Sequence, residues 1–263
     1  MAREINLNSD MGEGFGAYDI GNDAALLEIV NSANVACGFH AGDPVVMHRL
    51  VTGAKKNGVS IGAHPGFDDV QGFGRRHIQM KADEIEYMVA YQIWALQAMA
   101  QYAGLKVTHV KAHGALSNMA CRNGDYAMAI GRAIKTVDRS LIFVVIHGSE
   151  LQRVCDELGL VMAREGFADR QYDDDGLLAS RAIPGTVLHD PKIAAKQALM
   201  MAKDREVISR TGKRLKMEVE TICVHGDEPT AVPMAKAVRQ ALEGAGFKLK
   251  PLDRMQFARS SRA

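Results

Sequence analysis

The chain has 263 residues, of which 47% are hydrophobic, and this suits one large α/β domain or two small ones with a substantial core. Its 32 basic and 31 acidic side chains give a formal net charge of +1, which argues against nucleic acid or an anionic membrane as a partner. There is no apolar run of transmembrane length, no signal-peptide pattern and no Cys-x-x-Cys spacing among the four cysteines, so we expect a cytoplasmic protein without a zinc knuckle or disulfide framework.

Short apolar segments alternate with longer amphipathic ones along the chain. The predicted strands are 4–9, 32–36, 59–63, 107–110, 141–146, 160–163, 221–224 and 247–249. The predicted helices are 23–30, 45–56, 82–103, 126–137, 151–158, 191–209 and 232–242. Asp43 and Pro44 suit the N-cap and first position of the second helix, and Asn57-Gly58 suits its end.

Strand, loop and helix repeat about seven times, which favours a parallel sheet with helical crossovers. Residues 141–146 form a continuous apolar run, typical of a parallel strand buried on both faces. With this many units, a barrel or near-closed barrel is favoured over an open sheet. No linker or repeat divides the chain, so we predict a single α/β barrel-like domain over residues 1–263, with a frayed tail at 256–263.

Polar side chains stand where the predicted strands end, and parallel barrels place their chemistry there. These residues are Asn8, Asp10, His40, Asp43, His64, Lys111, His113, His147, Glu165, His225 and Asp227. Any one histidine can simply bond a carbonyl, but five from different strands have no packing reason to converge. The other four, His48, His77, His109 and His189, are interpreted as surface or packing residues.

Two of these strand-end residues have a structural alternative to a role in chemistry. For Asp43, a role as the helix N-cap accounts for about half of the reason to find an aspartate at this position. Lys111 ends an apolar strand and must be paired or used, because burying an unpaired ammonium is costly. A salt bridge to Asp10 or Glu165 is therefore the structural alternative for Lys111.

Two loops carry groups that suit an anion. Gly12, Gly14 and Gly16 can cradle phosphate with backbone N–H groups, although their spacing is neither the dinucleotide fingerprint nor the P-loop. A flexible loop over the barrel mouth is the alternative. Arg75-Arg76 can clamp a carboxylate or phosphate, or can form a solvated basic pair.

Seven segments, in the same order along nearly the whole chain, resemble the LamB/YcsF family of bacterial 5-oxoprolinase subunits. The segments are 7–16, 32–43, 61–66, 72–76, 111–116, 165–170 and 224–227. The chain departs from the family pattern at Ser9, Ala112 and Ser117, where the family has cysteine, proline and tyrosine. The last change removes an aromatic ring near His113 and bears on substrate identity more than on the fold.

The resemblance implies ATP-dependent opening of pyroglutamate (5-oxo-L-proline) to L-glutamate, with two partner subunits of the B and C type; a homo-oligomer is left open. The implied catalytic residues are Asp10, His40, His64, Lys111, His113 and Glu165. The implied substrate- or ATP-binding residues are Asn8, Glu13, Gly14, Asp43, Arg75, Arg170 and His225. Such a site needs cations for phosphate, here Lys111 and Arg75, together with a base for water and an acid for the departing nitrogen.

The expected fold is also similar to the glycoside hydrolase/deacetylase fold, in which polysaccharide deacetylases hold a divalent metal with one carboxylate and two histidines. By position, Asp10, His64 and His113 are that trio, and His40 is a substitute for either histidine. Two other functions remain open on sequence alone: a stand-alone metal-dependent deacetylase or amidohydrolase, and a non-catalytic substrate-binding subunit. The sequence does not separate a catalytic subunit from a substrate-binding one, because the barrel rim uses the same residue types in both cases.

Overall fold

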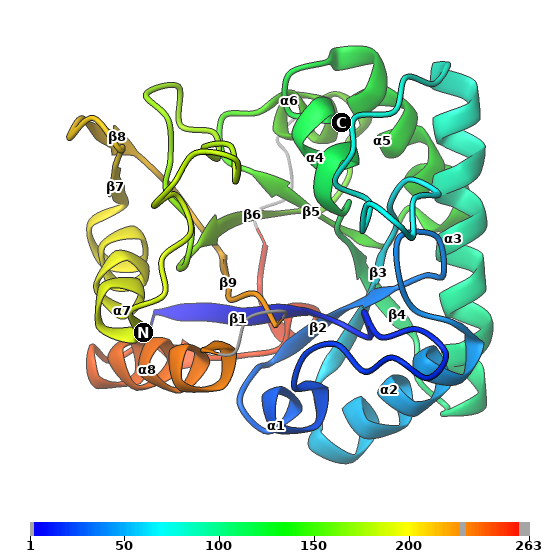
Figure 1. Cartoon of the computed structure of the whole chain (residues 1–263), viewed down its shortest axis with the longest axis horizontal. Helices are drawn as coiled ribbons and strands as arrows, with labels where there is room; N and C mark the ends of the chain where they lie inside the picture. Colours follow the sequence, from blue (N-terminus) through cyan, green and yellow to red (C-terminus); the bar gives the residue numbers. More distant parts are fainter. Residues whose placement is uncertain (1–2, 227–229, 258–263) are drawn as a thin grey trace.

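The computed structural model describes residues 3–226 and 230–257, and at its centre is a closed barrel of parallel strands (Figure 1). Its strands are β1 (Glu4–Met11), β2 (Ser32–Ala36), β3 (Ser60–His64), β4 (Val107–Val110), β5 (Ile142–Ile146), β6 (Met162–Phe167) and β9 (Thr221–Cys223). They pair in that order, and β9 also pairs with β1, which closes the ring. This confirms the predicted barrel of about seven parallel strands.

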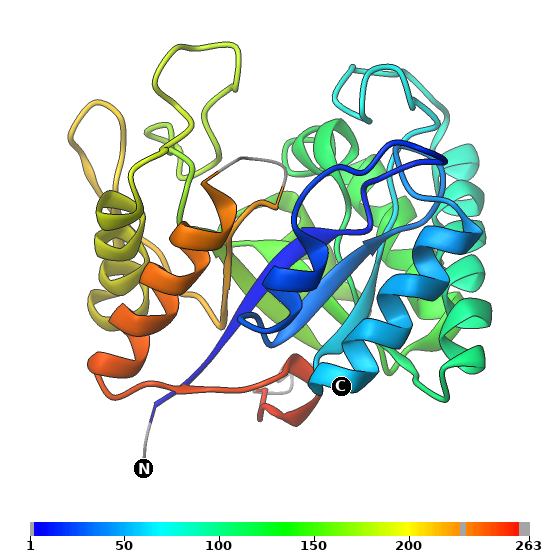
Figure 2. The same ribbon diagram turned by 60° about the horizontal axis from the view of Figure 1, so that its bottom comes forward.

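The helices lie around the outside of the barrel (Figures 1 and 2). They are α1 (Asp23–Leu27), α2 (Pro44–Asn57), α3 (Ala82–Tyr102), α4 (Gly114–Ala120), α5 (Gly124–Asp138), α6 (Glu150–Leu158), α7 (Pro191–Leu199) and α8 (Ala231–Gly244). Each buries an apolar stripe, as in α2, where Met47, Leu50 and Val51 face the core. Within residues 3–226 and 230–257, no helix is both long and apolar enough to cross a membrane.

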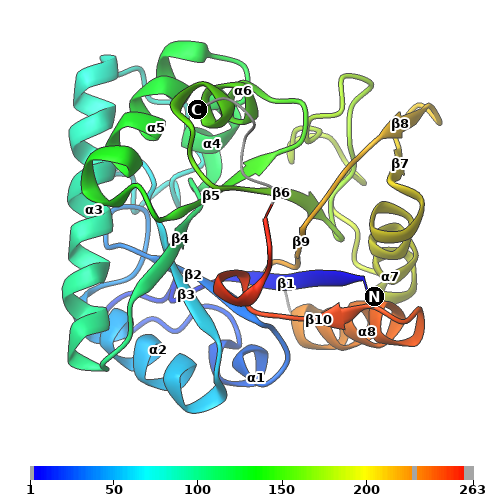
Figure 3. The ribbon, with the colours of Figure 1, turned by 180° about the vertical axis from the view of Figure 1, so that it is seen from behind.

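The C-terminal segment closes the end of the barrel where the strands begin (Figure 3). There β10 (Lys248–Leu249) pairs with the start of β1, and the 3₁₀ turn Leu252–Arg254 follows. Leu252 is fully buried against Ile142 and Val144 of β5. The opposite end of the barrel, where the strands finish, is not covered by this segment. The predicted frayed tail at 256–263 lies, from residue 258 onward, outside the described residues.

The barrel interior is filled by hydrogen-bonded polar side chains in layers rather than by a purely apolar core. In the lowest layer Asn6 Nδ2 donates to Ser32 Oγ at 2.8 Å. In the next layer Asn34 Nδ2 donates to Asn8 Oδ1 and to Asp10 Oδ1, both at 2.8 Å. Because buried polar groups are costly unless paired, this stack holds the strand-end charges above it in fixed positions.

Two predicted elements are wrong in extent. The helix predicted over 191–209 ends with α7 and a π-helical turn, Met200–Asp204. The chain then turns at Arg205, with φ 57°, into β7 (Glu206–Ile208), which pairs with β8 (Arg214–Lys216) as an antiparallel hairpin. The strand predicted at 160–163 instead forms β6, which continues to Phe167 because the charge of Glu165 finds a partner inside the barrel.

Asp43 caps α2 by accepting the backbone N–H groups of Val45 and Val46, both at 2.8 Å, and Gly58 ends this helix at φ 67°. The structural explanation of Asp43 is therefore confirmed. Most other predicted elements agree with the structure to within a few residues, while α4 was not predicted at all.

Asp23, at the start of α1, accepts a hydrogen bond from Gly12 N at 3.0 Å. Burial raises the pKa of Asp23 from 3.8 to about 6 despite that bond. The unfolded chain therefore loses this proton near pH 4 and the folded chain near pH 6, so the native state becomes less stable as pH rises between them.

The substitution Asp23→Asn keeps an acceptor for Gly12 but carries no charge. We expect it to raise the free energy of unfolding by about 1–3 kcal/mol at pH 7.5 and to change little below pH 4. Urea unfolding of both proteins at pH 4 and pH 7.5 measures this. An equal effect at the two pH values would contradict the assignment.

Candidate functional site

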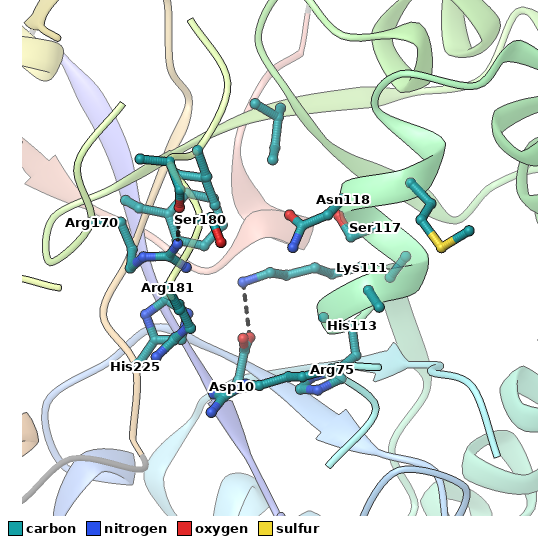
Figure 4. A pocket seen from close by; sticks show the side chains of 18 of the residues that line it. Asp10, Arg75, Lys111, His113, Ser117, Asn118, Arg170, Ser180, Arg181 and His225 are labelled. Carbon is teal, nitrogen blue, oxygen red and sulfur yellow. Dashed lines mark hydrogen bonds and ion pairs between the residues drawn. The ribbon is translucent and has the colours of Figure 1, made fainter. Parts of the chain in front are cut away.

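A cavity of about 670 Å³ opens where the barrel strands end. Figure 4 shows Lys111 and Asp10 near its middle, His113, Ser117 and Asn118 toward one side, and Arg170, Ser180, Arg181 and His225 toward the other. This volume suits a small molecule with a few fixed polar contacts.

Lys111, just after β4, is the buried cation of the site. Its Nζ lies 2.9 Å from Asp10 Oδ1 and 2.9 Å from Glu165 Oε1, and 5.0 Å from the centre of the Phe167 ring. Burial alone would lower the pKa of Lys111, but the carboxylates, above all Asp10, hold it well above its usual value. The ammonium is therefore charged and bridges both predicted partners at once.

The two carboxylates around Lys111 have opposite proton affinities. Burial opposes ionisation of Asp10, yet His64 and Lys111 hold its pKa well below the usual value. Burial raises the pKa of Glu165 in spite of Lys111 and of Asn8, which donates to it at 3.1 Å. Because their pKa values are shifted in opposite directions, Asp10 stays ionised while Glu165 can take up and release a proton. Glu165 lies behind Lys111 and does not line the cavity.

His64 and His113 point lone pairs at each other. His64 Nδ1 lies 2.7 Å from the Lys111 carbonyl oxygen, and His113 Nε2 lies 2.8 Å from the Phe73 carbonyl oxygen, so these two nitrogens carry the protons. The remaining nitrogens, His64 Nε2 and His113 Nδ1, are 3.0 Å apart, and both are acceptors when the two rings are neutral. Two acceptors at this distance are stabilised by a cation between or beside them.

Two carboxylates lie close to these rings, Glu13 beside His113 and His40, and Asp10 beside His64. Glu13 Oε1 lies 3.4 Å from His113 Nδ1 and 3.3 Å from His40 Nε2, and Asp10 Oδ2 lies 3.3 Å from His64 Nε2. Ligands at about 2.1 Å from one tetrahedral ion lie about 3.4 Å from each other, so these separations fit a divalent metal. Burial, with neighbouring imidazoles, holds the pKa values of His40 and His113 well below normal, which keeps both rings in the neutral, ligating form.

The group that meets metal-ligand spacing differs from the predicted trio. Its four members are Glu13, His40, His64 and His113, with ligand atoms within 4.8 Å of one another. Asp10 instead belongs to a second group, with Cys223 and His225. The predicted trio missed Glu13 because that residue lies in the glycine loop beyond the end of β1, and Asp10 is already bound to Lys111.

The glycine loop is tied to the protein through its own backbone. Gly12 N donates to Asp23, Gly16 N donates to Asp43 at 2.8 Å, and the Gly14 carbonyl accepts from Gly42 N at 2.9 Å. Gly14 and Asp43 do not line the cavity. The backbone N–H groups of Gly12 and Gly16 are therefore already paired within the protein and are not available to a phosphate.

Arg75 and Arg76 have different surroundings. Arg75 lines the cavity, with its guanidinium 4.8 Å from the Phe73 ring centre. Arg76 forms an ion pair with Asp69, which also accepts from Gly72 N at 3.0 Å. Arg76 therefore fastens the loop that covers His113, and Arg75 faces the ligand space.

Of the other predicted site residues, some line the cavity and the rest do not. Arg170 and His225 line the cavity, and Asn8 lies in the layer beneath it. His147 does not line the cavity; its charged neighbours are Arg164 and Glu218. Asp227 lies outside the described residues.

Several cavity residues were not predicted. They are His77, Asn118, Arg122, Asp173, Ser180 and Arg181. His77 is exposed, as the interpretation of it as a surface residue predicts, and it also lines the cavity. Ser117, which the sequence analysis connected with substrate identity, lines the cavity beside His113. The others follow no predicted strand directly, so the strand-end rule could not find them; recognising α4 would have indicated Asn118.

Comparisons with known proteins agree along the chain. The family model described as LamB/YcsF family matches residues 5–257. The A-type 5-oxoprolinase subunit of Rhodopseudomonas palustris (strain ATCC BAA-98 / CGA009) is 56% identical over 249 residues, covering 94% of this chain and 98% of that protein.

Solved structures share the fold. The lactam utilization protein from Thermus thermophilus superposes with a TM-score of 0.89 at 41% identity, covering 95% of this chain and 100% of that one. The catalytic domain of a peptidoglycan N-acetylglucosamine deacetylase from Eubacterium rectale gives 0.53 at 11% identity, covering 98% and 93%. The second likeness concerns the fold alone.

Proposed function

The chain belongs to the LamB/YcsF family, and on that premise we propose that it is the A-type subunit of an ATP-dependent 5-oxoprolinase. The reaction opens the lactam of 5-oxo-L-proline to L-glutamate, coupled to hydrolysis of ATP to ADP and phosphate. The observation that carries the proposal is the buried Lys111 between Asp10 and Glu165 on the floor of a cavity of small-molecule size.

The lactam is an unreactive amide, and its opening needs three groups. A cation stabilises negative charge on the activated amide oxygen, a base takes a proton from water, and an acid protonates the departing nitrogen. Lys111 supplies the cation, since its ammonium is held charged in a buried site. Glu165, whose pKa is raised, is the group beside Lys111 that takes up or releases a proton, and Asp10 stays ionised and fixes the position of Lys111.

The histidine cluster supports a divalent metal as part of the proposal. Glu13, His64 and His113 would hold it, with His40 beside them. A bound metal would supply a Lewis acid and a water of lowered pKa. His64 would then be oriented by its bond to the Lys111 carbonyl oxygen, and His113 by its bond to Phe73.

ATP dependence, a cytoplasmic location and the two partner subunits of B and C type are parts of the same proposal. The sequence has no recognisable nucleotide motif, and the curated relatives are named as subunits of an enzyme. The chain alone should therefore turn over 5-oxoproline poorly or not at all. The test measures ADP and glutamate together, with and without candidate partner subunits. Stoichiometric production of both by the chain alone would contradict the partner requirement.

The histidine cluster also favours a second candidate, a stand-alone metal-dependent deacetylase or amidohydrolase. Release of acetate from an N-acetylated compound without ATP would support it over the first. A purely binding role is distinguished by the double variant Asp10→Asn/Lys111→Met, which should retain activity in the complex only if this chain performs no chemistry.

A further inference from the structure

One wall of the cavity is cationic beyond what its own carboxylates neutralise (Figure 4). Among the described lining residues there are five arginines and lysines and three aspartates and glutamates. Asp10 is already bound to Lys111, and Asp173 to Arg210. The excess charge lies where Arg170 and Arg181 stand together.

Arg170 is buried and only partly satisfied. Its side chain donates to the Ala179 carbonyl oxygen at 2.6 Å, but its Nε is buried without a hydrogen-bond partner. Asp169, the neighbouring acid, accepts both the backbone N–H and Nδ1 of His225. Burial, together with the charge of Arg181, lowers the pKa of Arg170 to about 10. A buried guanidinium with a free donor is stabilised by an anion.

The Arg170 backbone is held in place. Its carbonyl accepts from Gln197 Nε2 at 2.7 Å, and it pairs with Val187 across an isolated bridge. Ser180, next to Arg181, adds a hydroxyl to the same wall. Guanidinium groups recognise planar anions with two parallel hydrogen bonds, which favours a carboxylate.

We propose that Arg170, Ser180 and Arg181 form a subsite for the carboxylate that 5-oxoproline carries beside its ring nitrogen. This inference rests on the proposed function. It assigns selection of the substrate to a wall separate from the cavity floor formed by Asp10 and Lys111. Lactams that lack the carboxylate are then excluded by the unpaired guanidinium groups that they leave.

The experiment titrates the full-length chain with 5-oxo-L-proline, with 2-pyrrolidinone, which is the same ring without the carboxylate, and with inorganic phosphate. It also measures KM for 5-oxoproline in the assembled complex. Arg181→Gln should weaken 5-oxoproline binding and raise KM by about tenfold to a hundredfold, whereas 2-pyrrolidinone should bind weakly to the wild type and no more weakly to the variant. Arg170→Gln should act likewise if it folds. The matched control is Arg153→Gln, because that arginine pairs with Glu150 and Glu157 and does not line the cavity.

The outcomes separate the subsite from the reaction. An unchanged KM in the Arg181→Gln complex overturns the subsite and leaves the 5-oxoprolinase proposal standing. Loss of phosphate binding alone reassigns the wall to a phosphoryl group and also overturns it. Absence of 5-oxoproline binding and turnover in the wild-type chain and complex overturns both proposals together.

An independent observation concerns the outer face of α3, which no other described element covers (Figures 1 and 3). Its exposed side chains include Tyr87, Tyr91, Trp94 and Tyr102, at 68%, 63%, 57% and 78% exposure. These are three of the six tyrosines and the single tryptophan of the chain. Residues 87–103 contain no charged side chain, which is unusual for an exposed helix face.

The α3 face is long enough and complementary enough to pair with itself. Four aromatic side chains at this exposure offer about 500 Å² in each copy, so two copies would bury about 1,000 Å², the lower range of a specific interface. Asp83 and Glu84 stand in the first turn of α3, and Lys55 and Lys106 lie near its other end. An antiparallel two-fold pairing brings each acidic end to a basic end.

We infer that α3 is the contact helix of a homodimer. Sedimentation of the full-length chain at micromolar concentration should show a dimer, and Trp94→Glu should weaken association at least a hundredfold. The control is Tyr18→Glu, which changes an equally exposed tyrosine outside α3. A monomeric wild type, or a dimer that Trp94→Glu leaves intact, overturns the inference. Loss of partner-subunit binding in Trp94→Glu without a wild-type dimer reassigns the face to that partner.

Discussion

Replacing Lys111 with methionine is expected to lower the 5-oxoproline-dependent rate of the assembled complex by about a hundredfold or more. Lys111 Nζ is the buried cation on the cavity floor, 2.9 Å from Asp10 and from Glu165. Methionine keeps the length and apolar stem of the side chain but removes the charge. The loss of one preorganised electrostatic contact to a developing anion typically has an effect of that size.

The same substitution leaves two buried carboxylates without their shared cation, and breaking such a pair destabilises a protein by about 3–5 kcal/mol. A loss of activity could then reflect unfolding. The double variant Lys111→Met/Glu165→Gln removes one of the two uncompensated carboxylates and should recover part of this stability. It should remain inactive, because neither the cation nor the proton-exchanging group is restored.

The measurement combines thermal unfolding of each variant with simultaneous assay of ADP and glutamate in the complex. Activity near the wild-type level in folded Lys111→Met would remove Lys111 from the mechanism. Recovery of activity in the double variant would show that the single variant failed only through its fold.

The barrel could be predicted from the sequence because the patterns that indicate its strands and helices are local. Apolar runs such as 141–146 mark a strand buried on both faces, and their alternation with helical patterns implies parallel pairing. The ring is closed by pairing of β9 with β1, which joins residues more than 200 positions apart. No local sequence pattern predicts this pairing. The β7–β8 hairpin was missed because residues 191–209 read as one continuous helical pattern, and the turn at Arg205 depends on its tertiary setting.

The strand-end rule brought Asp10, His64, Lys111 and His113 together correctly as neighbours, since the barrel alone decides where strand ends meet. It could not assign partners within that set. Glu13, rather than Asp10, stands with three histidines because a loop, not a strand, carries it. Arg181 comes from a loop whose path depends on the rest of the fold, so nothing near it in the sequence indicated the cavity.

Removal of His64 or His113 is expected to abolish tight binding of a divalent metal. In the neutral rings, the two nitrogens that face each other at 3.0 Å are both acceptors, because the other nitrogen of each ring donates to a carbonyl oxygen. Neutral imidazole and carboxylate together form a typical site for Zn²⁺ or another divalent transition metal. His64→Gln or His113→Gln should lower the affinity by more than the roughly 10- to 100-fold that follows loss of an outer hydrogen-bond partner.

His109→Gln is the matched control, because this buried histidine also lies inside the barrel but uses Nε2 to contact Asn34 Oδ1 at 3.1 Å and Nδ1 to contact Thr108. The measurement titrates the metal-free full chain with Zn²⁺ and Mn²⁺ and follows thermal unfolding at the same time. Metal at a hundred times its dissociation constant should stabilise the wild type by about 2.7 kcal/mol, and a variant that no longer binds should gain nothing. Equal stabilisation of wild type and His64→Gln would show that the ion binds elsewhere. A wild type that binds neither ion would mean that a proton, not a metal, lies between the two rings.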